Sequence, residues 1–306
     1  MKKITLVLLF LLLLFSCSKK EVIDDKLIIT ATNFPCYDAA RAVFGDKADI
    51  RMILPFGGES HSYEPTSDDI IRIMSSDLFI FTGGESETYV EKILSSLDDS
   101  VNTFALIDNV SILLIESEEG IIQSEEEEEE EVFDEHVWTS LSNEIEIISN
   151  LYEEAISLDP ANSSYYKANA EEYIERLSIL RDSFQEIINN SERKTLVVTD
   201  RFPLACFAYE FGLDHIAAFP GCVAESEASA KTIASLIDYV KENNIPAVMH
   251  MELANTLLSE VVSQETGCKI LEFNSCHNVS RREGLAGVTY ISLMENNLDV
   301  LREALN

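Results

Sequence analysis

The segment Gly57–Pro65, with the sequence GGESHSYEP, follows the short apolar run Met52–Pro55. A buried strand that runs into a glycine-rich turn is a common way to carry a side chain to the rim of an α/β domain. The side chain carried by this turn is His61, and imidazole is a common ligand of borderline metals. A single loop histidine is more often simply solvated, so the rest of the chain has to decide its role.

Short apolar runs alternate with helical patterns along the chain. Strands are expected at 27–32, 50–54, 78–82 and 104–107, and again at 195–199, 216–219, 246–252 and 269–273. Strands that alternate with helices indicate βαβ units and a mainly parallel sheet. The sequence therefore predicts an α/β protein with two domains, each with a mainly parallel four-stranded sheet flanked by helices.

A long helix is predicted between the two sets of strands. Its apolar positions step by three and four from Tyr166 to Ile187, which predicts a helix over 162–190. At about 1.5 Å per residue it would be roughly 40 Å long. One helix of that length can brace two domains against each other.

The composition narrows the range of functions. The chain has 306 residues, which suits about two domains, and 46% of them are hydrophobic, which allows real cores. Asp and Glu number 55 against 22 Lys and Arg, a formal net charge of −33. This charge argues against nucleic acid as a partner, since that needs a basic face, and favours attraction of cations.

A second histidine motif, Glu135–Trp138 (EHVW), follows a run of glutamates. Together with His61–Pro65 (HSYEP), it resembles the motifs of the metal-specific solute-binding proteins of bacterial ABC transporters, the zinc and manganese uptake family. The resemblance runs from about Ile28 to the C-terminus. It implies a rigid linker helix, capture of Zn²⁺ or Mn²⁺ as transported ligand in an interdomain cleft, and delivery to an ABC-transporter permease. It also implies a binding protein rather than an enzyme, and we expect a monomer.

Four residues are candidate metal ligands: His61, His136, Asp200 and His277. Each follows or lies near the end of a predicted strand, and open parallel sheets bind ligands outside the carboxyl ends of their strands. Two come from each half of the chain, so an interdomain cleft could bring four nitrogen and oxygen ligands around one ion. A closed set of four ligands holds zinc without leaving a position open for chemistry.

The resemblance assigns these ligands one by one. His61 and His136 match the first and second ligand motifs of the family. The third ligand is normally a histidine after the first strand of the second domain, where this chain offers Asp200, and the fourth is normally a carboxylate, where it offers His277. Three histidines with one carboxylate favour Zn²⁺, whereas two of each is the pattern of manganese-type relatives.

The remaining candidates have weaker claims to the site. We expect His250 to be a core residue of a strand and His215 a surface residue. Glu225 or Glu227 could replace Asp200 as a ligand, or could orient a ligand from behind.

The N-terminus has the pattern of an export signal over residues 1–17. A basic start precedes the apolar run Leu6–Phe15, which is too short to span a bilayer. The segment Leu14–Cys17 resembles a lipobox, which predicts lipidation of Cys17 and an extracytoplasmic, membrane-anchored lipoprotein. An ordinary secretory signal is the alternative.

Export permits disulfides, and Cys222 with Cys276 is the best pair, because both fall in loops after predicted strands of the second domain. The glutamate run could gather cations weakly or could simply be a solvated flexible loop. The expected layout is a tether at 18–26, an N-terminal lobe at 27–140 with an acidic loop at 116–131, a helical region at 141–190, and a C-terminal lobe at 191–306.

Three other functions compete with metal uptake. An adhesin or host-interaction lipoprotein is compatible with the sequence and with metal binding. A zinc-dependent hydrolase would need a general base near an open metal position, and the chain has no His-Glu-x-x-His motif. A Ca²⁺ protein would need oxygen-rich loops such as an EF-hand, which the sequence does not show.

Overall fold

The computed structural model describes residues 26–60, 62–84, 87–97, 100–114, 133–219 and 228–306. Cys17, His61, Cys222, the two glutamates at 225 and 227, and the acidic loop at 116–131 lie outside these ranges. No helix within them is long and apolar enough to cross a membrane.

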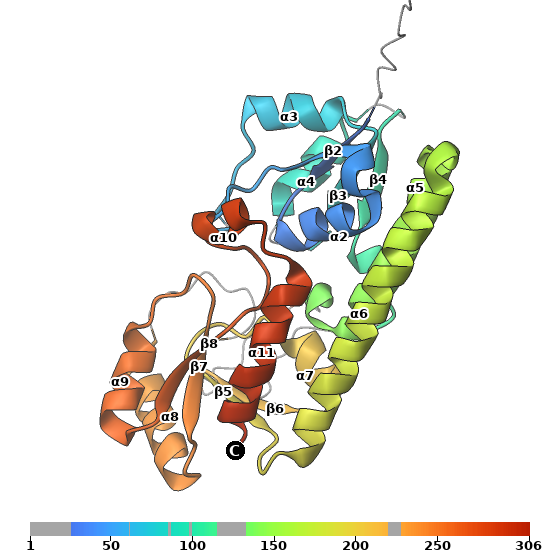
Figure 1. Ribbon diagram of the computed structural model, residues 1–306. Helices are drawn as coiled ribbons and strands as arrows, with labels where there is room; N and C mark the ends of the chain where they lie inside the picture. The colour runs from blue at the N-terminus through green and yellow to red at the C-terminus, as the bar shows by residue number, and fades with distance from the viewer. Residues whose placement is uncertain (1–25, 61, 85–86, 98–99, 115–132, 220–227) are drawn as a thin grey trace, which may run out of the picture.

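Two four-stranded parallel sheets organise the chain, as the sequence predicts (Figure 1). The first sheet has the order β2-β1-β3-β4 and the second the order β6-β5-β7-β8, so the two share one topology. The strands of the first are β1 (Leu27–Ala31), β2 (Ala48–Met52), β3 (Leu78–Phe81) and β4 (Asn102–Ala105). Those of the second are β5 (Thr195–Val198), β6 (Asp214–Ala217), β7 (Ala247–Met251) and β8 (Lys269–Phe273).

Helices surround the sheets and connect them. Those of the N-terminal lobe are α2 (Phe34–Phe44), α3 (Ser67–Met74) and α4 (Thr88–Leu94), and the connecting pair is α5 (Leu141–Leu158) and α6 (Ser163–Asn190). Those of the C-terminal lobe are α7 (Ala205–Phe211), α8 (Ala230–Glu242), α9 (Leu257–Thr266), α10 (Arg281–Ala286) and α11 (Tyr290–Ala304). Short 3-10 turns are η2 (Gly45–Lys47), η4 (Ile107–Asn109), η5 (Val137–Thr139) and η6 (Pro160–Asn162). The sequence pattern did not predict helix α10.

Three strands lie two residues earlier than predicted. The sequence predicts the apolar pair Ile53 and Leu54 in a strand, but β2 ends at Met52. Both residues are nevertheless buried, and their N–H groups donate to the carbonyls of Ala31 and Thr32 at 2.9 and 3.0 Å. Apolar runs therefore mark burial beyond the strand as well as the strand itself, and β4 and β6 show the same displacement.

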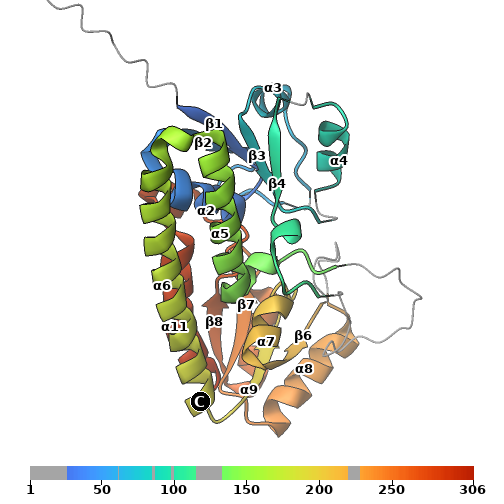
Figure 2. The ribbon, with the colours of Figure 1, turned by 90° about the vertical axis from the view of Figure 1, so that its right-hand side faces the viewer.

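Helix α6 joins the two lobes, in agreement with the predicted helix at 162–190. Its 28 residues span about 42 Å, and Figures 1 and 2 show it running beside both sheets. It contacts α2 in the N-terminal lobe and α7 and α11 in the C-terminal lobe. One face of the helix is buried, at Tyr166, Ala170, Tyr173, Leu177, Leu180, Phe184 and Ile188. These residues belong to one hydrophobic cluster that extends into both lobes.

Asp38 ties α2 to two distant helices. Its Oδ2 accepts hydrogen bonds from the Tyr290 backbone N–H at 2.8 Å and from the Tyr173 hydroxyl at 3.0 Å. Arg41 adds an ion pair at 3.3 Å. Burial raises the pKa of Asp38 above its ordinary value despite Arg41. A buried carboxylate is tolerated here because its oxygens are satisfied from three elements.

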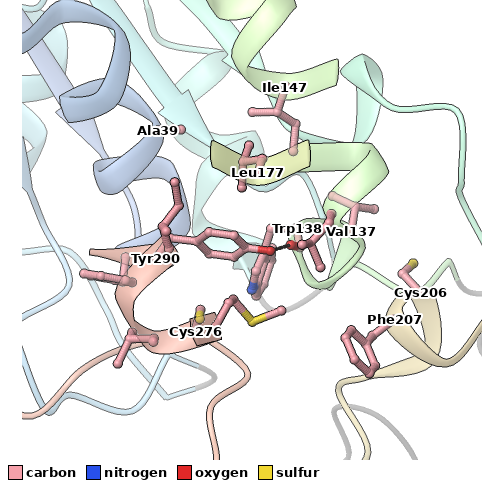
Figure 3. Close-up of a cluster of buried hydrophobic side chains, with 14 of the residues drawn as sticks. Ala39, Val137, Trp138, Ile147, Leu177, Cys206, Phe207, Cys276 and Tyr290 are labelled. Carbon is pink, nitrogen blue, oxygen red and sulfur yellow. Dashed lines mark hydrogen bonds between the residues drawn. The ribbon is translucent and has the colours of Figure 1, made fainter. Parts of the chain in front are cut away.

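Trp138 lies at the centre of the junction between the lobes (Figure 3). Its carbonyl accepts a hydrogen bond from the Tyr290 hydroxyl at 2.7 Å, and its indole N–H donates to the Ser275 carbonyl at 2.8 Å. Both aromatic side chains are fully buried. These two bonds fix the segment that follows the glutamate run against the C-terminal lobe.

Substitution of Tyr290 by Phe should lower the free energy of unfolding by about 1–2 kcal/mol, because the Trp138 carbonyl loses its buried donor. Urea unfolding measures this change. Tyr209→Phe is the matched control, since Tyr209 is 64% exposed on α7, and it should change stability little. Equal effects of the two substitutions would contradict the assignment.

Candidate metal centre

His136 is held by a carboxylate two residues before it. Its Nδ1 lies 2.7 Å from Oδ1 of Asp134, and its backbone N–H donates to the same oxygen at 3.1 Å. Both residues are buried, at 1% and 4% exposed. Burial acts to raise the pKa of Asp134, but the neighbouring His136 lowers the pKa below its ordinary value. A carboxylate beside Nδ1 favours the tautomer with its proton on that atom and a lone pair on Nε2.

His277 lies on the loop after β8, and that loop is held by Glu252 at the end of β7. The Glu252 carboxylate accepts the backbone N–H of Ser275 at 2.7 Å and that of His277 at 2.9 Å, and it accepts the Ser275 hydroxyl at 2.8 Å. Cys276, between them, has a φ of +60°, which is unusual for a residue with a side chain. The three hydrogen bonds hold this strained turn in place. Burial raises the pKa of Glu252 to about 7.

The rings of His136 and His277 meet at the junction of the lobes. Their centroids lie 5.4 Å apart, with the planes at 84°. The Trp138 ring lies 5.3 Å from His136 and 5.2 Å from His277. Two imidazoles on one tetrahedral zinc, with Zn–N bonds of about 2.0–2.1 Å, have centroids roughly 5 Å apart. The separation of these two rings therefore suits a shared ion.

Asp200 lies two residues beyond β5, at the same edge of the second sheet. Its Oδ2 accepts a long hydrogen bond of 3.4 Å from the Met251 N–H. Among the residues whose placement is given, no group of three or more His, Cys, Asp or Glu side chains is arranged to hold a metal ion. The structure thus brings together His136 and His277, but not Asp200 with them. His61 falls at one of the gaps, so the full set of four ligands stays a prediction.

The other histidines agree in part with expectation. His250 lies in β7, is 8% exposed, and has Nδ1 at 2.9 Å from the Met251 carbonyl, so its assignment to the core is confirmed. His215 is partly buried rather than a surface residue, because its ring stacks on Phe202 with the centroids 3.8 Å apart.

The cysteines that the structure describes are buried and form no disulfide with one another: Cys36, Cys206, Cys268 and Cys276. The predicted partner of Cys276 is Cys222, which falls in the gap at 220–227. This disulfide therefore stays a prediction.

Glu87 plays in the N-terminal lobe a part similar to that of Glu252. One of its oxygens accepts the backbone N–H of Thr82 at 2.8 Å and that of Gly83 at 3.3 Å. The side chain is 5% exposed, and burial raises its pKa from 4.5 to about 7. Glu135 lies against the neighbouring Gly84, where a Cβ would come within 1.8 Å of its carboxylate. Gly84 is therefore required for Glu135 to pack beside His136.

Comparison with known proteins places this arrangement in a family. The family model described as "Zinc-uptake complex component A periplasmic" matches residues 29–304. The chain belongs to this family. It consists of solute-binding proteins of transporters and is not an enzyme family.

Named relatives of the family are similar over nearly the whole chain. The zinc-binding lipoprotein AdcA of Streptococcus pneumoniae is 32% identical over 99% of this chain, and the chain spans 61% of the length of that relative. The high-affinity zinc uptake system protein ZnuA of Bacillus subtilis is 30% identical to this chain. The similarity covers 92% of this chain and 88% of the length of that relative. The crystal structure of the Zn(II)-bound ZnuA-like domain of S. pneumoniae AdcA has a TM-score of 0.77 at 29% identity, over 92% of this chain and 99% of that domain.

Sequence reasoning missed Asp134 and Glu252 as residues that orient the two histidines. Asp134 could have been found from its spacing, because a carboxylate two residues before a histidine can reach the ring through a turn. Glu252 had a weaker signal: it ends a buried strand beside the loop that carries His277. Only the order of the strands shows that this loop lies next to it.

The raised pKa of Glu87 predicts a pH-dependent cost to stability. Below about pH 4.5 the carboxyl is protonated in both states, while above about pH 7 the folded protein carries a buried charge. The folded protein therefore becomes less stable relative to the unfolded chain as the pH rises from about 4.5 to about 7, the two pKa values of Glu87. Substitution of Glu87 by Gln should stabilise the metal-free protein relative to wild type by about 3 kcal/mol more at pH 8 than at pH 4.5.

Urea unfolding of both proteins at the two pH values measures this difference. Glu91→Gln serves as the control, because Glu91 is exposed on the adjacent helix α4, and its effect should not change with pH. A Glu87→Gln effect that is the same at both pH values would contradict the assignment.

Proposed function

We propose that this protein captures Zn²⁺ between its two lobes and delivers it to an ABC-transporter permease. The observation that carries the proposal is the edge-to-face meeting of His136, from the N-terminal motif, with His277, from the loop after β8. The two residues are 141 positions apart in the chain. The buried Asp134 carboxylate contacts the His136 ring, and the Glu252 carboxylate holds the backbone of His277. The names of the relatives support zinc as the cargo.

The ligand set that we propose is His61, His136, His277 and Asp200. Neutral imidazole nitrogens suit Zn²⁺ better than Mn²⁺, which prefers more oxygen ligands. Asp134 favours the tautomer of His136 that has a lone pair on Nε2, and Asp200 would supply one carboxylate from the carboxyl end of β5. Four protein ligands would close the coordination shell, as binding without chemistry requires.

We further propose that the protein acts outside the cytoplasm as a monomer held to the membrane by lipidated Cys17. The lipobox-like segment before Cys17 and the description of the S. pneumoniae relative as a lipoprotein support this anchor. The excess of acidic residues, 55 against 22 basic ones, would raise the local concentration of cations near the cleft.

The test of this function is the metal content and affinity of the protein lacking residues 1–17, by elemental analysis and by competition titration with Zn²⁺ and Mn²⁺. We expect one tightly held Zn²⁺ per chain. His277→Ala should weaken zinc binding roughly a hundredfold or more. Loss of a residue that only orients a ligand usually weakens metal affinity by about tenfold to a hundredfold. His215→Ala is the control and should leave the affinity nearly unchanged, because β6 is at the opposite edge of the sheet from β8, the strand that leads to His277.

Preference for Mn²⁺ with no effect of His277→Ala would overturn the ligand set while leaving the family assignment in place. Absence of any tightly bound divalent metal would overturn the uptake function itself.

Glu252 should affect zinc affinity without touching the metal, because its carboxylate holds the backbone on both sides of Cys276. Glu252→Ala should weaken binding by about tenfold to a hundredfold, and Glu252→Gln, which keeps one acceptor oxygen, by less. The same titration measures both. Glu272→Ala, an exposed change on the neighbouring strand β8, should have no effect. A loss for Glu272→Ala as large as for Glu252→Ala would contradict this role.

A further inference from the structure

Asn278, the residue after His277, connects the two lobes directly. Its side-chain amide donates to the carbonyl of Pro55 and to the carbonyl of Gly58, both at 2.9 Å. Its Oδ1 accepts the backbone N–H of Val279 at 2.8 Å, so every polar atom of the side chain is satisfied. The residue is 4% exposed. Both N–H groups of one buried amide are thus used to bind an N-terminal turn to the loop of a C-terminal histidine.

The turn at Pro55–Gly58 fits closely against the C-terminal lobe on another side as well. The Phe56 ring packs on Gly284 of α10, where a Cβ would come within 2.4 Å of the ring. Figure 1 shows α10 beneath the loop that joins β2 to α3. Arg201 also faces Glu59 at 3.8 Å, but these side chains are 30% and 54% exposed. An exposed pair of this kind contributes little, so the buried amide is the stronger polar connection.

The geometry explains why the residue is an asparagine. Two carbonyls that face one side chain need two N–H donors in one plane, which a short amide supplies. Loss of the amide would remove a donor from both carbonyls, and the Pro55 carbonyl would keep only the Gly58 N–H. Loss of a buried donor costs more than the loss of an exposed hydrogen bond. The Pro55 carbonyl already accepts the Gly58 N–H at 2.8 Å, so the turn is preformed when the amide binds it.

We infer that Asn278 is a positioning residue that latches the turn Pro55–Gly58 onto the loop of His277, and that this latch sets the affinity and the release rate of the bound metal. The inference rests on the proposed metal-binding function. The turn leads directly to the N-terminal histidine motif in the sequence, so the latch joins the approaches to ligands of both lobes.

The latch acts through the population of the closed arrangement. When the binding-competent form is only a fraction of the protein, the apparent affinity falls by that fraction. Without the amide, the turn and the His277 loop separate more often, which lowers affinity and speeds dissociation. Release of the metal to a partner requires the same two hydrogen bonds to break.

The test uses Asn278→Ala and Asn278→Leu in the protein lacking residues 1–17. The two variants differ in volume but both lack the amide, so a shared effect reports the hydrogen bonds. We expect zinc to bind about tenfold more weakly and to dissociate faster in both. We also expect faster amide hydrogen exchange in a peptide covering 56–60 of the metal-free variants.

Asn169→Ala is the matched control, because this asparagine also donates its amide to a distant backbone carbonyl, that of Val43 at 3.0 Å, but between α6 and α2. It should leave zinc affinity and exchange at 56–60 unchanged. The Co²⁺ absorption spectrum gives a further readout, since a displaced His277 loop changes the ligand field whereas a purely global loss of stability does not.

Gly284→Ala tests the same latch through the apolar contact between α10 and Phe56, and it removes no buried polar group. Alanine is favoured over glycine in a helix, so α10 itself should be stabilised, whereas the new Cβ displaces Phe56 and the turn. Weaker zinc binding by a protein that is not less stable would support the latch. This variant also keeps the inference testable if the Asn278 variants fold poorly.

Unchanged zinc affinity and dissociation in the Asn278 and Gly284 variants would overturn the inference, as would effects no larger than that of Asn169→Ala. Absence of metal binding by the wild-type protein would instead overturn the proposed function. Hydrogen exchange at 56–60 in the metal-free protein separates the two, because it reports the latch whether or not zinc binds.

Discussion

The site depends on the hydrogen bonds of Trp138. Its indole N–H reaches the Ser275 carbonyl at 2.8 Å, and its own carbonyl accepts from Tyr290 at 2.7 Å. The partners lie 137 and 152 residues away in the sequence. Because His136 is two residues before Trp138 and His277 two after Ser275, these bonds bring the two imidazole rings edge to face. A fully buried indole also excludes water from one side of both rings.

The hydrophobic core around this junction is continuous between the two lobes. One buried cluster includes residues of α2, α5, α6 and α11 and extends into both lobes, and close-packed interiors of this kind resist gradual deformation. At the sheet edges the lobes also meet through polar contacts, as between Asn278 and the turn at Pro55–Gly58.

The two lobes share one structural feature, a glutamate that binds backbone N–H groups of a loop at the edge of the sheet. Both sheets share one strand order, and in each a glutamate follows the equivalent strand: the buried Glu87 after β3 and the partly buried Glu252 after β7. Burial raises both pKa values to about 7. Glu87 binds the backbone of its own loop, whereas Glu252 binds the loop of the neighbouring strand, which carries His277. The C-terminal copy has in this way become the support for a candidate ligand.

The sequence alone predicts the two parallel sheets, the long helix at 162–190 and the motif histidine His136, because apolar periodicity and local motifs are properties of neighbouring residues. Which distant residues meet is seen only in the folded protein: Glu252 beside the His277 loop, Trp138 in contact with both histidine rings, and Asn278 across the lobes. Strand limits were displaced by two residues because burial continues past the last ladder bond. These contacts join residues far apart in the chain, and no local pattern encodes the order in which strands lie side by side.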